Sequence, residues 1–438
     1  MCILLWTLPT SNHPRFKFAF ASNRDESITR ETSRADFWDV ESILNRATNP
    51  TKVSTNTAQA EPGSLPGNGN VDGSNGDKIG ILSGQDKQPA QTENYVFKET
   101  ETTATGEEKV TLMLSTEDVP GTWLGITTHG DLVGLTNYRE TAEYLAQKRP
   151  PKLSRGKVCG EFLVTMAAAR DGGAVANDRA EQWIKRRAIG WDTEFEGLNL
   201  LVVQNAGEQQ CVGGNREGSE LTVYNTPENA VISDHPRQSI EPGSVVGVSN
   251  SVFKRPWSKV HIGTQALEKT LNESISLFGA GPRASLQAQH RSNTHPHLAS
   301  DDDTVELAWL VIEMLTLLRV NTKPFPKDIS ESASLVLGLR ERVFIPLVHE
   351  YGTRSSTVVL FGRNNRLAVF VEKVWHGPPD ETTGDRIEFA PDSTDGLLWL
   401  QGLVGQPRKE WKRIEGQELE DLVRSAKEAH KFNVDTQL

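Results

Sequence analysis

The 438-residue sequence is poor in cysteine, has no run of basic residues and has no long uninterrupted apolar stretch. Its three cysteines, Cys2, Cys159 and Cys211, are too few and too widely spaced for a disulfide framework or a Cys-x-x-Cys metal site, which favours a reducing compartment. The formal net charge is -11. Because nucleic-acid binders need a basic surface to displace counterions from phosphates, we expect no nucleic-acid partner.

The apolar stretches are too short or too charged to predict a targeting or membrane-spanning segment. The opening MCILLWTLP lacks the basic region of a signal peptide, and Pro9 ends its apolar run. The stretch Val305–Val320 contains Glu306, Glu313 and Arg319 and is shorter than the roughly 20 apolar residues that cross a bilayer. We therefore expect no transmembrane segment.

Polar segments dilute the hydrophobic content to 36%, which lies below the roughly 45–50% of compact domains. Segments rich in Pro, Gly, Ser, Thr and Asn occur at about residues 45–78, 87–109 and 281–303. Such compositions bury too little apolar surface to offset the entropy of ordering, so we predict disordered insertions. The predicted organisation is one domain of residues 1–390, followed by an extension of residues 391–438 with one amphipathic helix.

Alternating strands and a few long helices, in mixed order, predict an α+β fold. The first residues predict a β-hairpin of Cys2–Leu8 with Phe16–Ala21. A second hairpin pairs Thr122–Thr127 with Leu132–Asn137, and the glycines inside its strands indicate a close approach of backbone or a ligand. The remaining predicted elements are the strands Leu198–Val203, Gln210–Gly213 and Ser244–Val248, the hairpin Ser356–Gly362 with Leu367–Val374, and the helices Lys157–Arg170 and Val305–Val320.

Cys2 is the first candidate for chemistry. If Met1 is removed, Cys2 carries both a thiol, with a pKa near 8.5, and an α-amine, with a pKa near 7.7–8.0. A nucleophile and a base within one residue is the arrangement of N-terminal nucleophile (Ntn) enzymes. The alternative is a small strand cysteine that packs like a hydrophobic residue, and the residue alone does not decide between them.

The polar tetrad Asn23-Arg24-Asp25-Glu26 ends the first hairpin, which brings it close to Cys2. Strand alternation places Asn23 and Asp25 on one face and Arg24 and Glu26 on the other. An arginine beside Cys2 could stabilise a thiolate or bind a carboxylate or phosphate. The alternative is a solvated turn with local ion pairs.

Two further groups of residues are interpreted structurally. Three histidines, His290, His295 and His297, lie in a polar segment without a rigid scaffold, so no metal site is predicted there. Three tryptophans, Trp123, Trp257 and Trp309, are predicted to belong to the core.

Several motifs in a fixed order resemble one protein family. They are MC before an apolar strand, ASNRDE, TWLGITTHGDLVGLTNY, SRG (Ser154–Gly156), GLNLLVV (Gly197–Val203), GNR (Gly214–Arg216), GVSNSVFKRPWSKV (Gly247–Val260) and YGTRSSTVVL (Tyr351–Leu360). Together they resemble the NRDE family, also called the transport and Golgi organisation protein 2 family, over roughly residues 1–390. The predicted polar insertions interrupt the resemblance.

The resemblance implies a fold and a set of site residues. The family is distantly similar to choloylglycine hydrolases, penicillin V acylases and acyl-CoA:penicillin acyltransferases, which are Ntn hydrolases with a four-layer αββα sandwich. By motif, Cys2 is then the nucleophile, Asn137 and Asn250 provide polar groups to the oxyanion hole, and Arg354 orients the cysteine. These four residues are expected to meet in one pocket.

One departure concerns the tetrad. The acylases space an early arginine and aspartate as Arg-x-x-Asp, whereas Arg24 and Asp25 are adjacent here. We therefore expect one of the two, Arg24 or Asp25, at the wall of the pocket around Cys2.

The resemblance also implies function, and two classes stay open. The first is a role in Golgi organisation, secretion and lipid (acyl-CoA) or haem homeostasis, with a pocket around Cys2 that holds a small acyl, lipid or haem ligand. The second is an active N-terminal-cysteine acyl hydrolase or transferase on a small amide or acyl thioester. Neither requires a cofactor, although haem or acyl-CoA could be bound. The expected location is the cytoplasm, with association with the Golgi, the ER or mitochondria, and the oligomeric state stays open.

Overall fold

The computed structural model describes most of the chain outside several polar segments. The described residues are 2–9, 13–43, 80–85, 96–102, 108–115, 119–138, 154–171, 179–188, 195–214, 221–225, 244–253, 255–278, 301–321, 338–348, 350–363, 366–379 and 386–437. Nearly all of the predicted insertions 45–78 and 281–303 lie outside them, as do the three histidines of the second.

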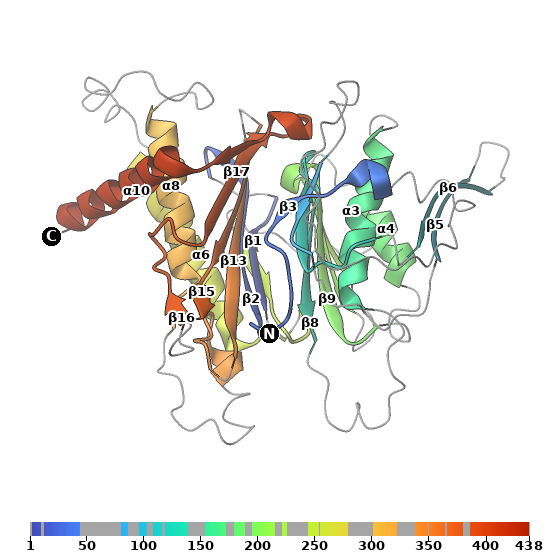
Figure 1. Cartoon of the computed structure of the whole chain (residues 1–438), viewed down its shortest axis with the longest axis horizontal. Helices are drawn as coiled ribbons and strands as arrows, with labels where there is room; N and C mark the ends of the chain where they lie inside the picture. Colours follow the sequence, from blue (N-terminus) through green and yellow to red (C-terminus); the bar gives the residue numbers. More distant parts are fainter. Residues whose placement is uncertain are drawn as a thin grey trace.

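Two seven-stranded antiparallel sheets stack face to face at the centre of the molecule (Figure 1). The first has the order β12-β1-β2-β13-β14-β17-β18, with bounds Val245–Val248, Ile3–Thr7, Phe16–Ser27, Tyr351–Gly362, Leu367–Val374, Leu397–Leu403 and Lys412–Ile414. The second has the order β11-β10-β9-β8-β7-β4-β3, with bounds Leu221–Asn225, Gln209–Gly214, Leu198–Gln204, Leu132–Asn137, Leu124–Thr127, Ile81–Ser83 and Asp36–Phe37.

Helices cover the outer face of each sheet. On the first sheet lie α6 (Ser258–Phe278) and α8 (Asp301–Leu317), with α10 (Gly416–Gln437) packed against α8. On the second sheet lie α3 (Arg155–Asp171) and α4 (Arg179–Ala188). This order of layers confirms the predicted α+β fold as a four-layer αββα sandwich.

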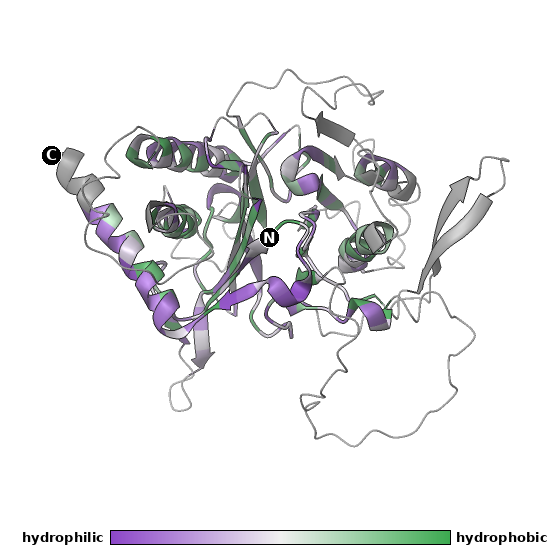
Figure 2. Ribbon diagram, turned by 90° about the horizontal axis from the view of Figure 1, so that it is seen from above, coloured by the Kyte–Doolittle hydropathy of each residue, from purple (hydrophilic) through white to green (hydrophobic). Residues whose placement is uncertain are grey.

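Strand alternation divides the apolar residues among three cores. On β1, Ile3 and Leu5 contact the layer of α6 and α8, whereas Leu4 and Trp6 lie between the two sheets. A third core fills the space between the second sheet and α3 and α4. In Figure 2 the central strands are mostly hydrophobic, while the outer helix α10 carries many hydrophilic residues. Cys2, one residue before Ile3, therefore belongs to the face between the sheets.

The two strand glycines mark close approaches of leucine side chains, whereas their positions predicted an approach of backbone or a ligand. A Cβ at Gly125 on β7 would lie 2.6 Å from a methyl carbon of Leu163 on α3, so the helix packs directly on this strand. A Cβ at Gly134 on β8 would lie 3.1 Å from a side-chain carbon of Leu4 on β1. A larger residue at either position would push neighbouring layers apart.

Two segments differ from the organisation predicted from composition. Residues 391–438 are not only a helical extension, because β17 pairs with β14 along its whole length and β18 pairs with β17. The predicted insertion 87–109 contains β5 (Val96–Thr102) and the start of its antiparallel partner β6 (Glu108–Ser115). Composition missed these strands because their Thr and charged residues resemble those of a polar loop.

Candidate functional site

Cys2 lines a cavity of about 210 Å³ at the end of the sandwich where β1 begins, β8 ends and α3 begins. The side chain of Cys2 is half-buried. Most of its described lining residues have polar or charged side chains; the lining residues are Cys2, Arg24, Glu26, Arg30, Thr122, Trp123, Leu135, Asn137, Ser154, Arg155, Gly156 and Glu196. Both sheets and the first turn of α3 thus contribute to one concave site.

The surroundings of Cys2 act on its thiol in opposite directions. Burial raises the pKa of the Cys2 thiol above its usual value, and the Asp25 carboxylate adds to the increase. The positive charge of the chain N-terminus lowers the pKa of the thiol most, and a hydrogen bond from the Asp25 backbone N–H and the Arg24 guanidinium also lower it. Because burial is the largest influence, a base is needed to generate the thiolate at neutral pH.

Arg24 and Asp25 lie on opposite faces of β2. Arg24 is one of the cavity residues; its guanidinium carbon lies 3.6 Å above the ring centre of Trp123, and Nη1 donates to Thr32 Oγ1 at 3.1 Å. Asp25 points toward the helical layer, where Thr353 Oγ1 donates to its Oδ1 at 2.7 Å. Of the adjacent pair, the arginine is therefore the one that lines the cavity.

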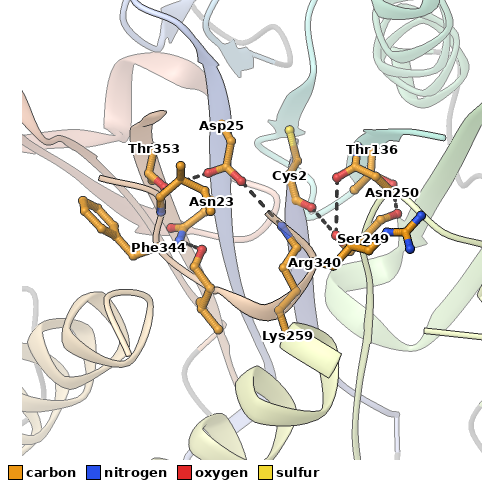
Figure 3. A network of polar contacts seen from close by, with 12 residues as sticks. Cys2, Asn23, Asp25, Thr136, Ser249, Asn250, Lys259, Arg340, Phe344 and Thr353 are labelled. Carbon is orange, nitrogen blue, oxygen red and sulfur yellow. Dashed lines mark hydrogen bonds and ion pairs between the residues drawn. The ribbon is translucent and has the colours of Figure 1, made fainter. Parts of the chain in front are cut away.

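Lys259, in the first turn of α6, lies within the motif Gly247–Val260 but was not predicted as a site residue. Its ammonium lies 3.6 Å from Asp25 Oδ2, and both side chains are fully buried. Burial lowers the pKa of Lys259, while Asp25 and Cys2 act to raise it. Figure 3 shows the Lys259 side chain directed toward the Asp25 carboxylate, beside Cys2. A lysine in a polar motif is usually exposed, so only the three-dimensional pairing identifies it.

Asn137 and Asn250 are joined to each other, and Ser249 links Asn250 to Cys2. Asn137 is half-buried and lines the cavity, and its carbonyl oxygen accepts a hydrogen bond from Asn250 Nδ2. The Ser249 hydroxyl lies 2.7 Å from the Cys2 carbonyl oxygen, to which it donates, and 3.3 Å from Asn250 Oδ1. Asn250 is not among the described residues that line the cavity. It is linked to the cavity by its hydrogen bond to Asn137, which does line it.

Side chains of the second sheet fix the position of the segment Ser249–Ser251, which follows β12. Asn199 Nδ2 donates to the carbonyl oxygens of Ser249 and Ser251 at 2.9 and 2.8 Å and to Thr136 Oγ1 at 3.1 Å. The Thr136 hydroxyl in turn donates to the Ser249 carbonyl oxygen at 2.7 Å. These buried contacts tie β8 and β9 of the second sheet to the end of β12 in the first (Figure 3).

Arg354 lies near the site but is not among the described residues that line the cavity. It occupies an irregularity in β13, and its guanidinium donates to the carbonyl oxygen of Arg30, which does line the cavity. Glu372 is buried nearby, and burial raises its pKa, although a hydrogen bond from the Ala35 N–H and the charges of Arg34, Arg24 and Arg354 lower it. Arg354 thus supports the cavity wall from behind.

Metal-binding clusters and membrane-spanning helices are both absent from the described part of the chain. Within them, no cluster of three or more His, Cys, Asp or Glu side chains could hold a metal ion. No helix in the described part of the chain combines the length and the apolar character needed to cross a bilayer.

The chain folds as a four-layer αββα sandwich, and Cys2 lines a cavity where the first strand begins. It belongs to the Transport and Golgi organisation 2 family, whose sequence profile matches residues 1–48 and 93–377. The gap in the match covers most of the first polar segment and the start of the second.

Three mammalian relatives share this family name. Identity is 26% over 160 residues with the Transport and Golgi organization 2 homolog of Mus musculus. It is 25% over 248 residues with the Bos taurus protein and 24% over 284 residues with the Homo sapiens protein. These alignments cover 36%, 55% and 63% of this chain, and 46%, 67% and 67% of the relatives. The chain thus spans about half the length of the mouse relative.

Among solved structures, two variants of the conjugated bile acid hydrolase from Clostridium perfringens align with 11% sequence identity. The TM-scores are 0.28 and 0.31, over 95% of this chain and 98% and 97% of theirs.

Proposed function

We propose that the cavity around Cys2 binds a small acyl compound and that the Cys2 thiol accepts its acyl group. The observation that carries this proposal is that Cys2, Arg24 and Asn137, whose side chains end in a thiol, a guanidinium and an amide, line one cavity. These groups are the nucleophile, the cation and the hydrogen-bond donor that acyl transfer needs. In this proposal the reaction serves Golgi organisation, secretion and acyl-CoA or lipid homeostasis, in a cytoplasmic protein that associates with organelle membranes.

The proposed reaction starts after removal of Met1. The α-amine of Cys2 takes the thiol proton, and the sulfur attacks the acyl carbon to form a C–S bond. The Asn137 amide donates to the developing oxyanion, and the bond to the leaving group breaks as that group takes the proton from the α-ammonium. Water then attacks the thioester and gives a proton to the α-amine, which returns it to the sulfur as the acid leaves.

A second function, binding without turnover, is favoured by one observation. Burial raises the pKa of the Cys2 thiol, so the group is neutral unless a base acts on it.

The cavity volume of about 210 Å³ lies below the roughly 300–1,000 Å³ of pockets for larger ligands, which favours a small acyl group over haem.

The test uses the full chain lacking Met1 and a short-chain acyl thioester. We expect an acyl adduct on Cys2 in intact-mass spectra and catalytic release of free thiol, both lost in Cys2→Ser. Removing one oxyanion donor, as in Asn137→Ala, should slow release by on the order of 10²–10³. Equal release by wild type and Cys2→Ser would exclude the catalytic proposal. Saturable binding without an adduct would assign the second function.

A further inference from the structure

A close contact between α6 and β1 brings Lys259 to the end of the first sheet where Cys2 lies. Lys259 and Gly263 are four residues apart, so they share one face of the helix, and both are buried. A Cβ at Gly263 would lie 2.8 Å from a side-chain carbon of Leu5 and 3.4 Å from one of Ile3, so the helix packs directly on β1. One turn earlier, Lys259 therefore reaches the strand ends beside Cys2 (Figure 3).

Asp25 connects Lys259 to the sulfur of Cys2. On one face of β2 its carboxylate lies 3.6 Å from the Lys259 ammonium and accepts a hydrogen bond from Thr353 Oγ1 at 2.7 Å. Its backbone N–H donates to the Cys2 sulfur. The residue that binds the sulfur is thus itself held by a buried cation.

The strand pairing at Asp25 is irregular, so its side-chain contacts help to fix its position. Asp25 pairs with Thr353 of β13, and the register of the two strands shifts between Thr353 and Ser355. Such an irregularity locally disrupts the ladder of backbone hydrogen bonds. The buried contacts of Asp25 with Lys259 and Thr353 stabilise the strand at this point.

Charged groups from several elements act on the Cys2 thiol. On β2 the Asp25 carboxylate raises the pKa of the thiol and the Arg24 guanidinium lowers it, as does the charge of the chain N-terminus. The Cys2 thiolate acts in turn to raise the pKa of Arg155 on α3 and of Lys259 on α6. Because the interaction between two charges is mutual, Lys259 favours the thiolate and opposes the effect of Asp25. The other charged residues among the described lining are Glu26, Arg30 and Glu196.

We propose that Lys259 is a positioning residue for the Cys2 nucleophile. Lys259 fixes Asp25, whose backbone N–H binds the Cys2 sulfur, and its charge offsets the negative charge that Asp25 places near the thiolate. Lys259 is not among the described residues that line the cavity, so it acts through Asp25. This inference rests on the proposed function, because it concerns the nucleophile of the same reaction.

Alkylation of Cys2 by iodoacetamide in the full chain, measured over a range of pH, reports on the thiolate without any acyl donor. Cys159 and Cys211 are buried, and peptide mass analysis separates their products from that of Cys2. In Lys259→Met the Asp25 carboxylate loses its ammonium partner, so the midpoint of the pH profile should rise by about one unit. Alkylation below the midpoint should then be about tenfold slower, and the rates should converge above both midpoints.

Three further variants separate the charge of Lys259 from its effect on stability. Lys259→Gln can still donate to Asp25 but carries no charge, so it should shift the midpoint even where Lys259→Met does not fold. In Lys259→Met/Asp25→Asn the carboxylate is absent too, and the midpoint should return toward that of the wild type. The matched control is Glu306→Gln, which removes a buried charge that pairs with Arg15, near the turn between β1 and β2 and at the other end of these strands from Cys2. Its midpoint should not change.

The outcomes separate this inference from the proposed reaction. An unchanged midpoint in folded Lys259→Met or Lys259→Gln would overturn the inference, and so would an equal shift in Glu306→Gln. A midpoint in the double variant as high as in Lys259→Met would overturn it as well. A shifted profile in Lys259→Met, with no acyl transfer by the wild type, would support the role of Lys259 and reject the reaction. Acyl transfer by the wild type with unchanged profiles in the variants would support the reaction and overturn the inference.

Discussion

The buried ion pair between Lys259 and Asp25 allows a quantitative prediction about stability. In Lys259→Met the ammonium is replaced by an uncharged side chain of similar length, while the Asp25 carboxylate stays buried beside Thr353. At 3.6 Å and an effective dielectric constant of about 20, two unit charges attract by about 5 kcal/mol. Much of this attraction offsets the desolvation of the two groups.

The loss on breaking the pair is larger than its net contribution, because the buried Asp25 carboxylate loses its ammonium partner. We expect Lys259→Met to lower the free energy of unfolding by about 3–5 kcal/mol. In Lys259→Met/Asp25→Asn neither charge remains, and the amide can still accept the Thr353 hydrogen bond. The double variant should therefore be more stable than Lys259→Met, and far more stable than additive losses would make it.

Urea unfolding at pH 7, followed by circular dichroism, measures these differences. The control is Lys269→Met in the same helix, where Lys269 is 76% exposed and pairs with Glu273 across one turn. Exposed pairs of this kind contribute about 0.3–0.5 kcal/mol, so little change is expected. A loss below about 1 kcal/mol for Lys259→Met, or strictly additive losses in the double variant, would refute the reasoning.

Three other predictions concern the removal of Met1, the loss of stability in acid and the polar segments. Intact-mass analysis after cytosolic expression should show a chain lighter by Met1; complete retention of Met1 in functional protein would exclude an Ntn mechanism. Burial lowers the pKa of His13 from 6.5 to about 4, so only the unfolded chain takes up the proton between these values. Stability should thus fall by about 3 kcal/mol from this residue between pH 6.5 and 4, and urea titrations of His13→Gln should show a shallower decline. Replacing Asn45–Lys78 or Gly281–Ser300 by a short Gly/Ser linker should leave the melting temperature nearly unchanged, and a large drop would show that the segment packs on the domain.

The strands that were predicted correctly are those that pair with a strand close to them in the sequence. The hairpin of β13 and β14 and the pairing of β1 with β2 follow from short apolar runs joined by turn residues. The helix α8 was predicted from Val305, whereas it begins at Asp301, because the acidic residues expected as caps form its first turn. The helix α6 was missed, since its buried positions include Gly, Thr and Ser, which weaken the apolar stripe.

The site was predictable only in part. Motif order indicated Cys2, Arg24 and Asn137, which the structure brings to one cavity. Trp123 packs against the core between the sheets and Trp309 is buried, as predicted, but the sequence did not indicate that Trp123 also lines the cavity and stacks on Arg24. The hydrophobic pattern of the sequence could not predict the contact between Lys259 and Asp25, because this contact depends on how the first turn of α6 packs near β2.

The adjacency of Arg24 and Asp25, which departs from the spacing in the acylases, has a structural consequence. Successive residues of a strand face opposite sides of the sheet, so the pair cannot share one cavity. Arg24 carries positive charge into the space beside Cys2, while Asp25 directs negative charge toward Lys259. Asp25 still reaches the thiol through its backbone N–H, which does not depend on the direction of its side chain. Arg24 therefore places its positive charge at the cavity, whereas Asp25 binds Lys259 and Thr353 on the other face of β2.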